Sequence, residues 1–217
     1  MNITTQGKKH LGAVIGHPTY KNEFVSELVE KWTAQIKALA EIAAFEPHAA
    51  YTAFTSCIRH RYSFYFRTIP NIANLVQPLE DAIRLCLIPA LTEGRHVSGD
   101  ERNLLSLPPR LGGMGLISPV QICDQEHTFS KCATATLTNA IIDQQKDLPE
   151  SFAETSKLAR QDTRLKRRQL QSELLDDLKS RMSSDQKRAN ESSCELGASN
   201  WLTALPIEQK GFSPQQT

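Results

Sequence analysis

The stretch Leu107-Pro108-Pro109-Arg110-Leu111-Gly112-Gly113-Met114-Gly115-Leu116 combines two prolines with three glycines. Proline ends a helix that precedes it, and glycine adopts backbone conformations that bulkier residues cannot. We therefore expect a tight chain reversal between two apolar segments. The amides of Gly112 and Gly113 are candidates for phosphate binding, although a purely conformational role for them is favoured. Arg110 is the stronger candidate for a phosphate contact.

A second glycine-punctuated stretch lies about ninety residues upstream, at Lys8-Lys9-His10-Leu11-Gly12-Ala13-Val14-Ile15-Gly16. Apolar residues alternate along it, and His17-Pro18 closes it. This pattern predicts a short β-hairpin before the first helix.

Helices are predicted for most of the remaining chain. Apolar residues recur at steps of three and four from Phe24 to Ala43, with Asn22 as the expected N-cap. Pro47 is expected to open a second helix, which Pro70 ends. Pro78 and Pro89 are expected to bracket a third.

Two further helices flank the glycine-rich turn. One is expected from about Gly99 to Leu107, with Ser98 as its cap and Asp100 and Glu101 at its positive end. The other is expected to begin at Ser118-Pro119 and to run towards Ile142.

Residues 151–195 are polar and charged, and they predict a long, weakly anchored helix or helix pair. Within 157–189, ten basic residues stand against five acidic ones. The expected apolar stripe of this segment is sparse, and it consists of Leu158, Leu165, Leu174, Leu175, Leu178 and Met182. Since no clean heptad holds across it, a coiled coil is not predicted.

Composition limits the possible classes of function. The chain has 217 residues, 40% apolar content and a net charge of +1, so any nucleic-acid affinity must come from local patches. Five scattered cysteines suit a reducing compartment. With neither a membrane-spanning stretch nor a signal peptide, an intracellular protein without a membrane partner is expected.

Five blocks of this sequence are similar, in order and spacing, to reverse transcriptases of non-LTR-type mobile elements. The stretch around Gly12 resembles the primer-grip hairpin of these enzymes. The stretch around Gly113 resembles an element that follows their helical thumb. The others are Glu46–Phe54, Leu79–Arg84 with Leu87–Thr92, and Ser199–Pro206.

The resemblance implies a mainly α fold, in which a short β-hairpin precedes a helical thumb-like array and a long polar helical segment. It divides the chain into a primer-grip-like hairpin remnant at 1–17, a thumb-like domain at 18–146, a charged helical segment at 147–196 and a tail at 197–217. That tail would lead towards a downstream Cys/His-rich region that the chain does not reach.

The expected function is that of a non-catalytic fragment of an RNA-directed DNA polymerase. The parent enzymes hold Mg²⁺ with palm carboxylates that would precede Lys8, so this chain is expected to need no cofactor and to have no polymerase activity. Leu174-Leu175-Asp176-Asp177 imitates the catalytic pattern, but it falls inside a predicted helix and is interpreted as a solvated acidic face.

The expected partner is an RNA/DNA hybrid or other nucleic acid, bound weakly and without sequence specificity through its phosphates, with the palm region as a possible second partner. The second predicted helix also carries three basic residues, Arg59, Arg61 and Arg67. The binding candidates are Lys8, Lys9, Leu11, Gly12, Arg110, Gly112, Gly113, Arg164, Lys166, Arg167 and Arg168.

Other kinds of site find little support. Cys123 and His127 would share a helix face, but Cys132 would lie near the opposite one, so no metal site is expected. Hydrolase elbows, phosphate loops and dinucleotide fingerprints are lacking. The competing hypothesis is a helical module that binds another protein through the face of 24–43 or through 151–195.

Overall fold

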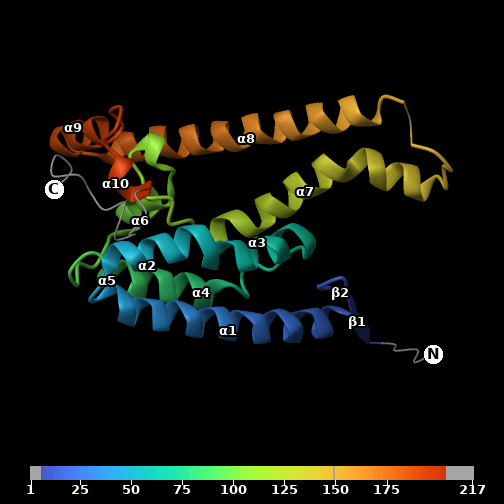
Figure 1. Cartoon of the computed structure of the whole chain (residues 1–217), viewed down its shortest axis with the longest axis horizontal. Helices are drawn as coiled ribbons and strands as arrows, with labels where there is room; N and C mark the ends of the chain where they lie inside the picture. The colour runs from blue at the N-terminus through green and yellow to red at the C-terminus, as the bar shows by residue number, and fades with distance from the viewer. Residues whose placement is uncertain (1–5, 149, 204–217) are drawn as a thin grey trace, which may run out of the picture.

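The computed structural model describes residues 6–148 and 150–203. It is mainly α, with a two-stranded antiparallel hairpin before the helices, as the sequence predicts. The helices form a lower layer built on α1 and an upper layer that contains α8, with α7 running obliquely between them (Figure 1). Most of the tail predicted at 197–217 lies outside the described residues.

The hairpin consists of β1 (Gly7–His10) and β2 (Ala13–Gly16), which pair with Lys9 opposite Val14. Its two-residue turn has positive φ at Leu11 (47°) and Gly12 (86°), as the favoured hairpin turns require. A leucine rarely adopts this conformation. The side chain of Leu11 lies at the tip of the turn and is 86% exposed.

Helix α1 (Pro18–Ala43) begins before Asn22, so the prediction of an Asn22 cap was wrong. Pro18 occupies the first turn, where its missing N–H and fixed φ favour a helix start. The ring of His17 caps the helix instead, because its Nδ1 accepts a hydrogen bond from the amide of Thr19 at 3.4 Å. The apolar face of α1 is buried as the periodicity predicts.

The second predicted helix is continuous from α2 (Pro47–Ala53) through a π-helical turn (Phe54–Ile58) to α3 (Arg59–Thr68). A similar turn (Ile83–Leu87) joins α4 (Gln77–Ala82) to α5 (Ile88–Leu91).

Pro89 therefore does not end the third helix, contrary to the prediction. In a regular α-helix its ring would clash with the carbonyl four residues earlier. The wider π-helical turn before it changes that register, so the chain remains helical through the proline.

Helix α6 (Gly99–Ser106) has the predicted Ser98 cap, which Glu101 completes as a capping box. A 3₁₀ turn (Pro109–Leu111) and the glycine stretch then reverse the chain. Gly112 has a φ of 77°. Gly113 is required for another reason, because a Cβ there would overlap the carbonyl oxygens of Leu104 and Leu107.

Helix α7 (Pro119–Ile142) starts at the predicted position. The charged segment forms a helix pair, α8 (Phe152–Arg181) and α9 (Ser184–Ser193), followed by the short α10 (Asn200–Thr203). Asp176 and Asp177 are exposed on α8, in agreement with their interpretation as a solvated acidic face.

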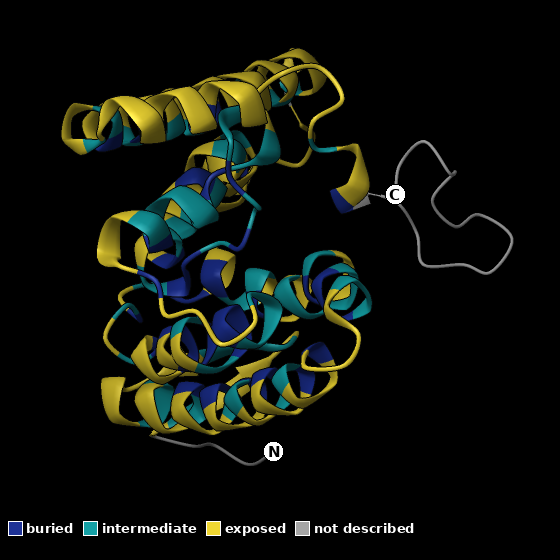
Figure 2. Cartoon of the chain, turned by 90° about the vertical axis from the view of Figure 1, so that its left-hand side faces the viewer, coloured by how far each residue is buried: buried dark blue, intermediate teal, exposed yellow. Residues whose placement is uncertain are grey.

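The main core lies between α1 and the helices from α2 to α5, and it includes Trp32, Tyr62 and Phe66. Figure 2 shows buried residues concentrated in this lower part of the molecule, whereas the top is mostly exposed. A small second core attaches α8 to the glycine turn through Leu107, Leu175 and Leu178. No described helix meets the length and apolarity needed to span a bilayer.

Only the C-terminal part of the predicted α8 stripe is buried. Leu158 and Leu165 are 58% and 64% exposed, so the prediction that they belong to one apolar stripe with Leu175 and Leu178 was wrong. They lie seven residues apart, on the face of α8 opposite to the one that contacts α7 and the second core.

Candidate nucleic-acid interface

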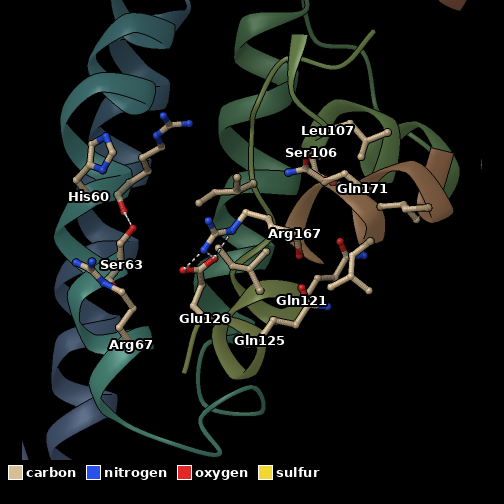
Figure 3. Close-up of a pocket in the computed structure, with 16 residues that line it drawn as sticks. His60, Ser63, Arg67, Ser106, Leu107, Gln121, Gln125, Glu126, Arg167 and Gln171 are labelled. Atoms are coloured by element: carbon tan, nitrogen blue, oxygen red, sulfur yellow. Dashed lines mark hydrogen bonds and ion pairs between the residues drawn. The ribbon is translucent and has the colours of Figure 1, made fainter. Parts of the chain in front are cut away.

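A polar groove lies between α3 and α8, with α7 as its floor. It has a volume of about 690 Å³ and is open to solvent. Figure 3 shows His60, Ser63 and Arg67 along one wall, with Glu126 and Arg167 across from them. Helix α7 packs against both α3 and α8. Its buried residues include Cys123 in the main core and Phe129 beside Arg167 of α8.

The α3 wall carries two arginines. Arg59, Ser63 and Arg67 recur every four residues and therefore share one helix face. Arg67 Nε donates to the carbonyl of Ser63 at 3.3 Å. Within residues 6–148 and 150–203, neither arginine forms an ion pair with a carboxylate. Both guanidinium groups are therefore available to an anion in the groove.

The floor of the groove holds an ion pair. Arg167 binds Glu126 in a forked arrangement, with N–O distances of 2.8, 3.0 and 3.1 Å. The guanidinium also lies 5.2 Å from the ring centroid of Phe129, within cation–π range. Arg167, a predicted phosphate contact, is thus already held by a carboxylate and an aromatic ring.

The rest of the predicted basic cluster divides in two. Lys166 Nζ lies 2.8 Å from a carboxylate oxygen of Asp162, and this hydrogen bond raises the lysine pKa. Arg164 and Arg168 are exposed and have no ion-pair partner among the described carboxylates. Being four residues apart, they project from the same side of α8.

The backbone amides of the glycine stretch form hydrogen bonds within the turn. The N–H of Gly112 donates to the carbonyl oxygen of Pro109 at 2.9 Å, and the N–H of Gly113 donates to the carbonyl oxygen of Pro108 at 3.3 Å. Their geometry therefore supports a conformational role and leaves neither amide for a phosphate. Arg110 is exposed and hydrogen-bonds the side-chain oxygen of Gln171, which lines the groove.

The hairpin presents its two lysines on opposite faces, because side chains alternate along a strand. Lys9 Nζ lies 5.8 Å from the ring centroid of Phe24 on α1. Gly12 approaches Phe64 of α3 so closely that a Cβ would lie 3.2 Å from the ring. The hairpin tip therefore abuts the helix that forms one wall of the groove.

The structure thus brings Arg167 to the groove, links Arg110 to it through Gln171 and places Leu11 and Gly12 beside α3, but it does not gather all predicted residues at one point. Sequence reasoning missed Glu126 and the groove-lining Gln121 and Gln125. Their spacing of four residues on the helix predicted from Pro119 could have placed the two glutamines on one face. No local sequence pattern indicates that Glu126 pairs with Arg167, because the two residues are 41 positions apart.

Two ionisable groups on α7 have shifted pKa values. Burial raises the pKa of the Cys123 thiol to about 11. Partial burial and the charge of Lys131 lower the pKa of His127. No three His, Cys, Asp or Glu side chains of the described segments gather as a metal-binding group.

Comparison with known proteins gave no further identification: no family model, no curated protein and no solved structure matches this chain.

Proposed function

We propose that this chain binds a nucleic-acid duplex, such as an RNA/DNA hybrid, through its phosphates. In this proposal it is the non-catalytic, duplex-holding part of an RNA-directed DNA polymerase of a retrotransposon. The observation that carries the proposal is the presence of two arginine pairs that have no carboxylate partner within residues 6–148 and 150–203. We call Arg59 and Arg67 the α3 pair, and Arg164 and Arg168 the α8 pair.

Uncompensated charge matters more here than the number of basic residues. The net charge of +1 provides little general attraction to a polyanion. A lysine or arginine that is already held by a carboxylate must lose that partner before it neutralises a phosphate. The α3 and α8 pairs have no such partner among the described carboxylates, so they supply the local positive charge that phosphate binding requires.

The hairpin supports the polymerase part of the proposal. Its strained, exposed Leu11 and its close Gly12 contact with α3 place an apolar turn beside the groove-forming helix. Backbone strain of this kind is retained where the surrounding structure or a function requires it. In the proposed complex, this turn supports one strand end while the arginine pairs hold the duplex backbone.

Titration of the whole chain with a fluorescent RNA/DNA hybrid tests the proposal. We expect a dissociation constant on the order of 10⁻⁴–10⁻⁶ M, as for non-specific binding by phosphate contacts. The affinity should fall steadily as salt rises from roughly 50 to 200 mM, because binding releases counterions. A hybrid of unrelated sequence should bind equally well, because phosphate contacts carry no base information. Absence of binding at low salt would contradict the proposal.

A helical protein-interaction module is the second candidate. It is favoured by the exposed apolar side chains Ile141, Ile142, Leu158 and Leu165 near the end where α7 and α8 pair. Binding to the hybrid that does not respond to salt, or no binding at all, would favour this second function.

A further inference from the structure

Neutral amides line the floor of the α3–α8 groove between its charged walls. Gln121 and Gln125 are exposed on α7, one helical turn apart, and both line the groove (Figure 3). Gln121 Nε2 donates to Asn103 at 2.8 Å, which leaves its oxygen able to accept. Gln171 accepts from Arg110, which leaves its NH₂ group able to donate. The amide of Gln125 has no partner among the described side chains, so both of its polar ends are available.

The charges in the groove determine where a bound strand would place its phosphates. Glu126 lies on the floor beside Gln125, where its carboxylate repels a phosphate, and Arg167 balances that charge. Among the described residues that line the groove, the arginines without a carboxylate partner are Arg59 and Arg67 on the α3 wall. A strand in the groove is therefore expected to lay its phosphates along α3 and its sugars or base edges on the glutamine floor.

The size of the groove limits what can enter it. Its volume of about 690 Å³ lies within the range of roughly 300–1,000 Å³ that is typical of small-molecule sites. Such a space fits one or two nucleotides of an unpaired strand. A whole duplex does not enter a space of this size, because its major groove alone measures about 12 Å across, so a bound duplex meets the α3 pair only where the groove opens to solvent.

We infer that this groove binds an unpaired RNA strand that continues from the duplex, and that Gln121, Gln125 and Gln171 hydrogen-bond its 2′-hydroxyl groups. The inference rests on the proposed function. A 2′-hydroxyl both donates and accepts a hydrogen bond and distinguishes RNA from DNA, and a glutamine amide offers a complementary acceptor and donors. A DNA strand lacks the hydroxyl and leaves these amides without a partner as the strand displaces water.

Three hybrids that share one duplex test the inference. One is blunt, one carries a few unpaired uridines and one carries the same number of deoxyuridines, so the last two differ only in the 2′-hydroxyl. We expect the uridine overhang to tighten binding about tenfold over the blunt hybrid, consistent with two or three added hydrogen bonds. The deoxyuridine overhang should give only a small part of that gain.

The variant Gln121→Ala/Gln125→Ala should abolish the gain from uridine and leave binding of the blunt hybrid unchanged. Gln169→Ala is the matched control, because Gln169 is exposed on α8 outside the groove and bonds Glu173. Its overhang gain should equal that of the unmodified chain. Unchanged melting temperatures in both variants would show that the fold is intact.

Equal gains from both overhangs, no gain from either, or a gain retained in Gln121→Ala/Gln125→Ala would overturn the inference. In each of these cases, salt-dependent binding of the blunt hybrid would leave the proposed function standing. If the blunt hybrid itself fails to bind, the proposed function fails together with the inference.

Discussion

Arg102 and Glu80 form a buried, two-pronged ion pair. Arg102 Nε and Nη2 donate to the two carboxylate oxygens of Glu80 at 2.7 and 2.8 Å, and both residues are less than a tenth exposed. Arg102 Nη1 also donates to the carbonyl of Leu116 at 2.6 Å. One side chain thus joins α4, α6 and the end of the glycine-rich turn.

Replacing Arg102→Met should lower the free energy of unfolding by about 3–5 kcal/mol, because Glu80 would remain buried without its partner. Urea denaturation followed by circular dichroism measures the change. The double variant Glu80→Leu/Arg102→Met should be more stable than the single one, since it removes the uncompensated charge. A double variant as unstable as the single would show that lost bonds to Leu116, rather than the buried charge, account for the effect.

Gly113→Ala should destabilise the fold by about 1–3 kcal/mol, because the added Cβ overlaps the backbone oxygens of Leu104 and Leu107. Gly99→Ala is the matched control. A Cβ at Gly99 meets nothing within 4 Å, so this variant should be neutral or slightly stabilising. Equal melting temperatures for the two variants would rule out the tight packing of the turn described above.

The five cysteines should differ in their reactivity towards a thiol reagent. Cys57, Cys132 and Cys194 are exposed and should react quickly near pH 8. Cys123 is buried, and its thiol pKa is raised to about 11, so it should react only after unfolding. Mass spectrometry of the labelled peptides provides the measurement. Rapid native labelling of Cys123 would place α7 differently from its position against α3.

The same raised pKa affects stability at alkaline pH. The folded state holds Cys123 as a neutral thiol, whereas the unfolded chain ionises near the ordinary value of 9.0. The stabilisation that the neutral Cys123 thiol gives the folded state is therefore fully present below pH 9.0, and it is lost as pH rises towards about 11. Cys123→Ser should show a smaller loss of melting temperature over this range, which thermal denaturation at several pH values can measure.

Local signals account for the parts of the fold that were predicted correctly. Pro47, Ser98 and Pro119 mark helix starts through their own backbone or side-chain chemistry, and the structure has those starts. Asn22 and Pro89 misled the prediction because a neighbouring residue changed their context. Pro18 had already begun the helix before Asn22, and a π-helical turn accommodated Pro89.

The site was less predictable, because it depends on pairs that are distant in sequence. The basic character of Arg59, Arg67, Arg164 and Arg168 was evident from composition, but the absence of carboxylate partners for them in the described part of the chain was not. Glu126 and Arg167 are 41 residues apart, and only the packing of α7 on α8 brings them together. Sequence alone therefore could not separate the compensated Arg167 from its uncompensated neighbours.

Charge reversal of the α8 pair tests the central claim most directly. Arg164→Glu/Arg168→Glu should weaken binding to every hybrid sequence alike and reduce the slope of log affinity against log salt by about two, one for each lost phosphate contact. The matched control Lys187→Glu/Arg188→Glu makes the same change in net charge on α9, where both residues are exposed, and should retain most of the affinity and slope. Equal losses in both variants, or binding unaffected by the α8 reversal, would contradict phosphate binding at this site.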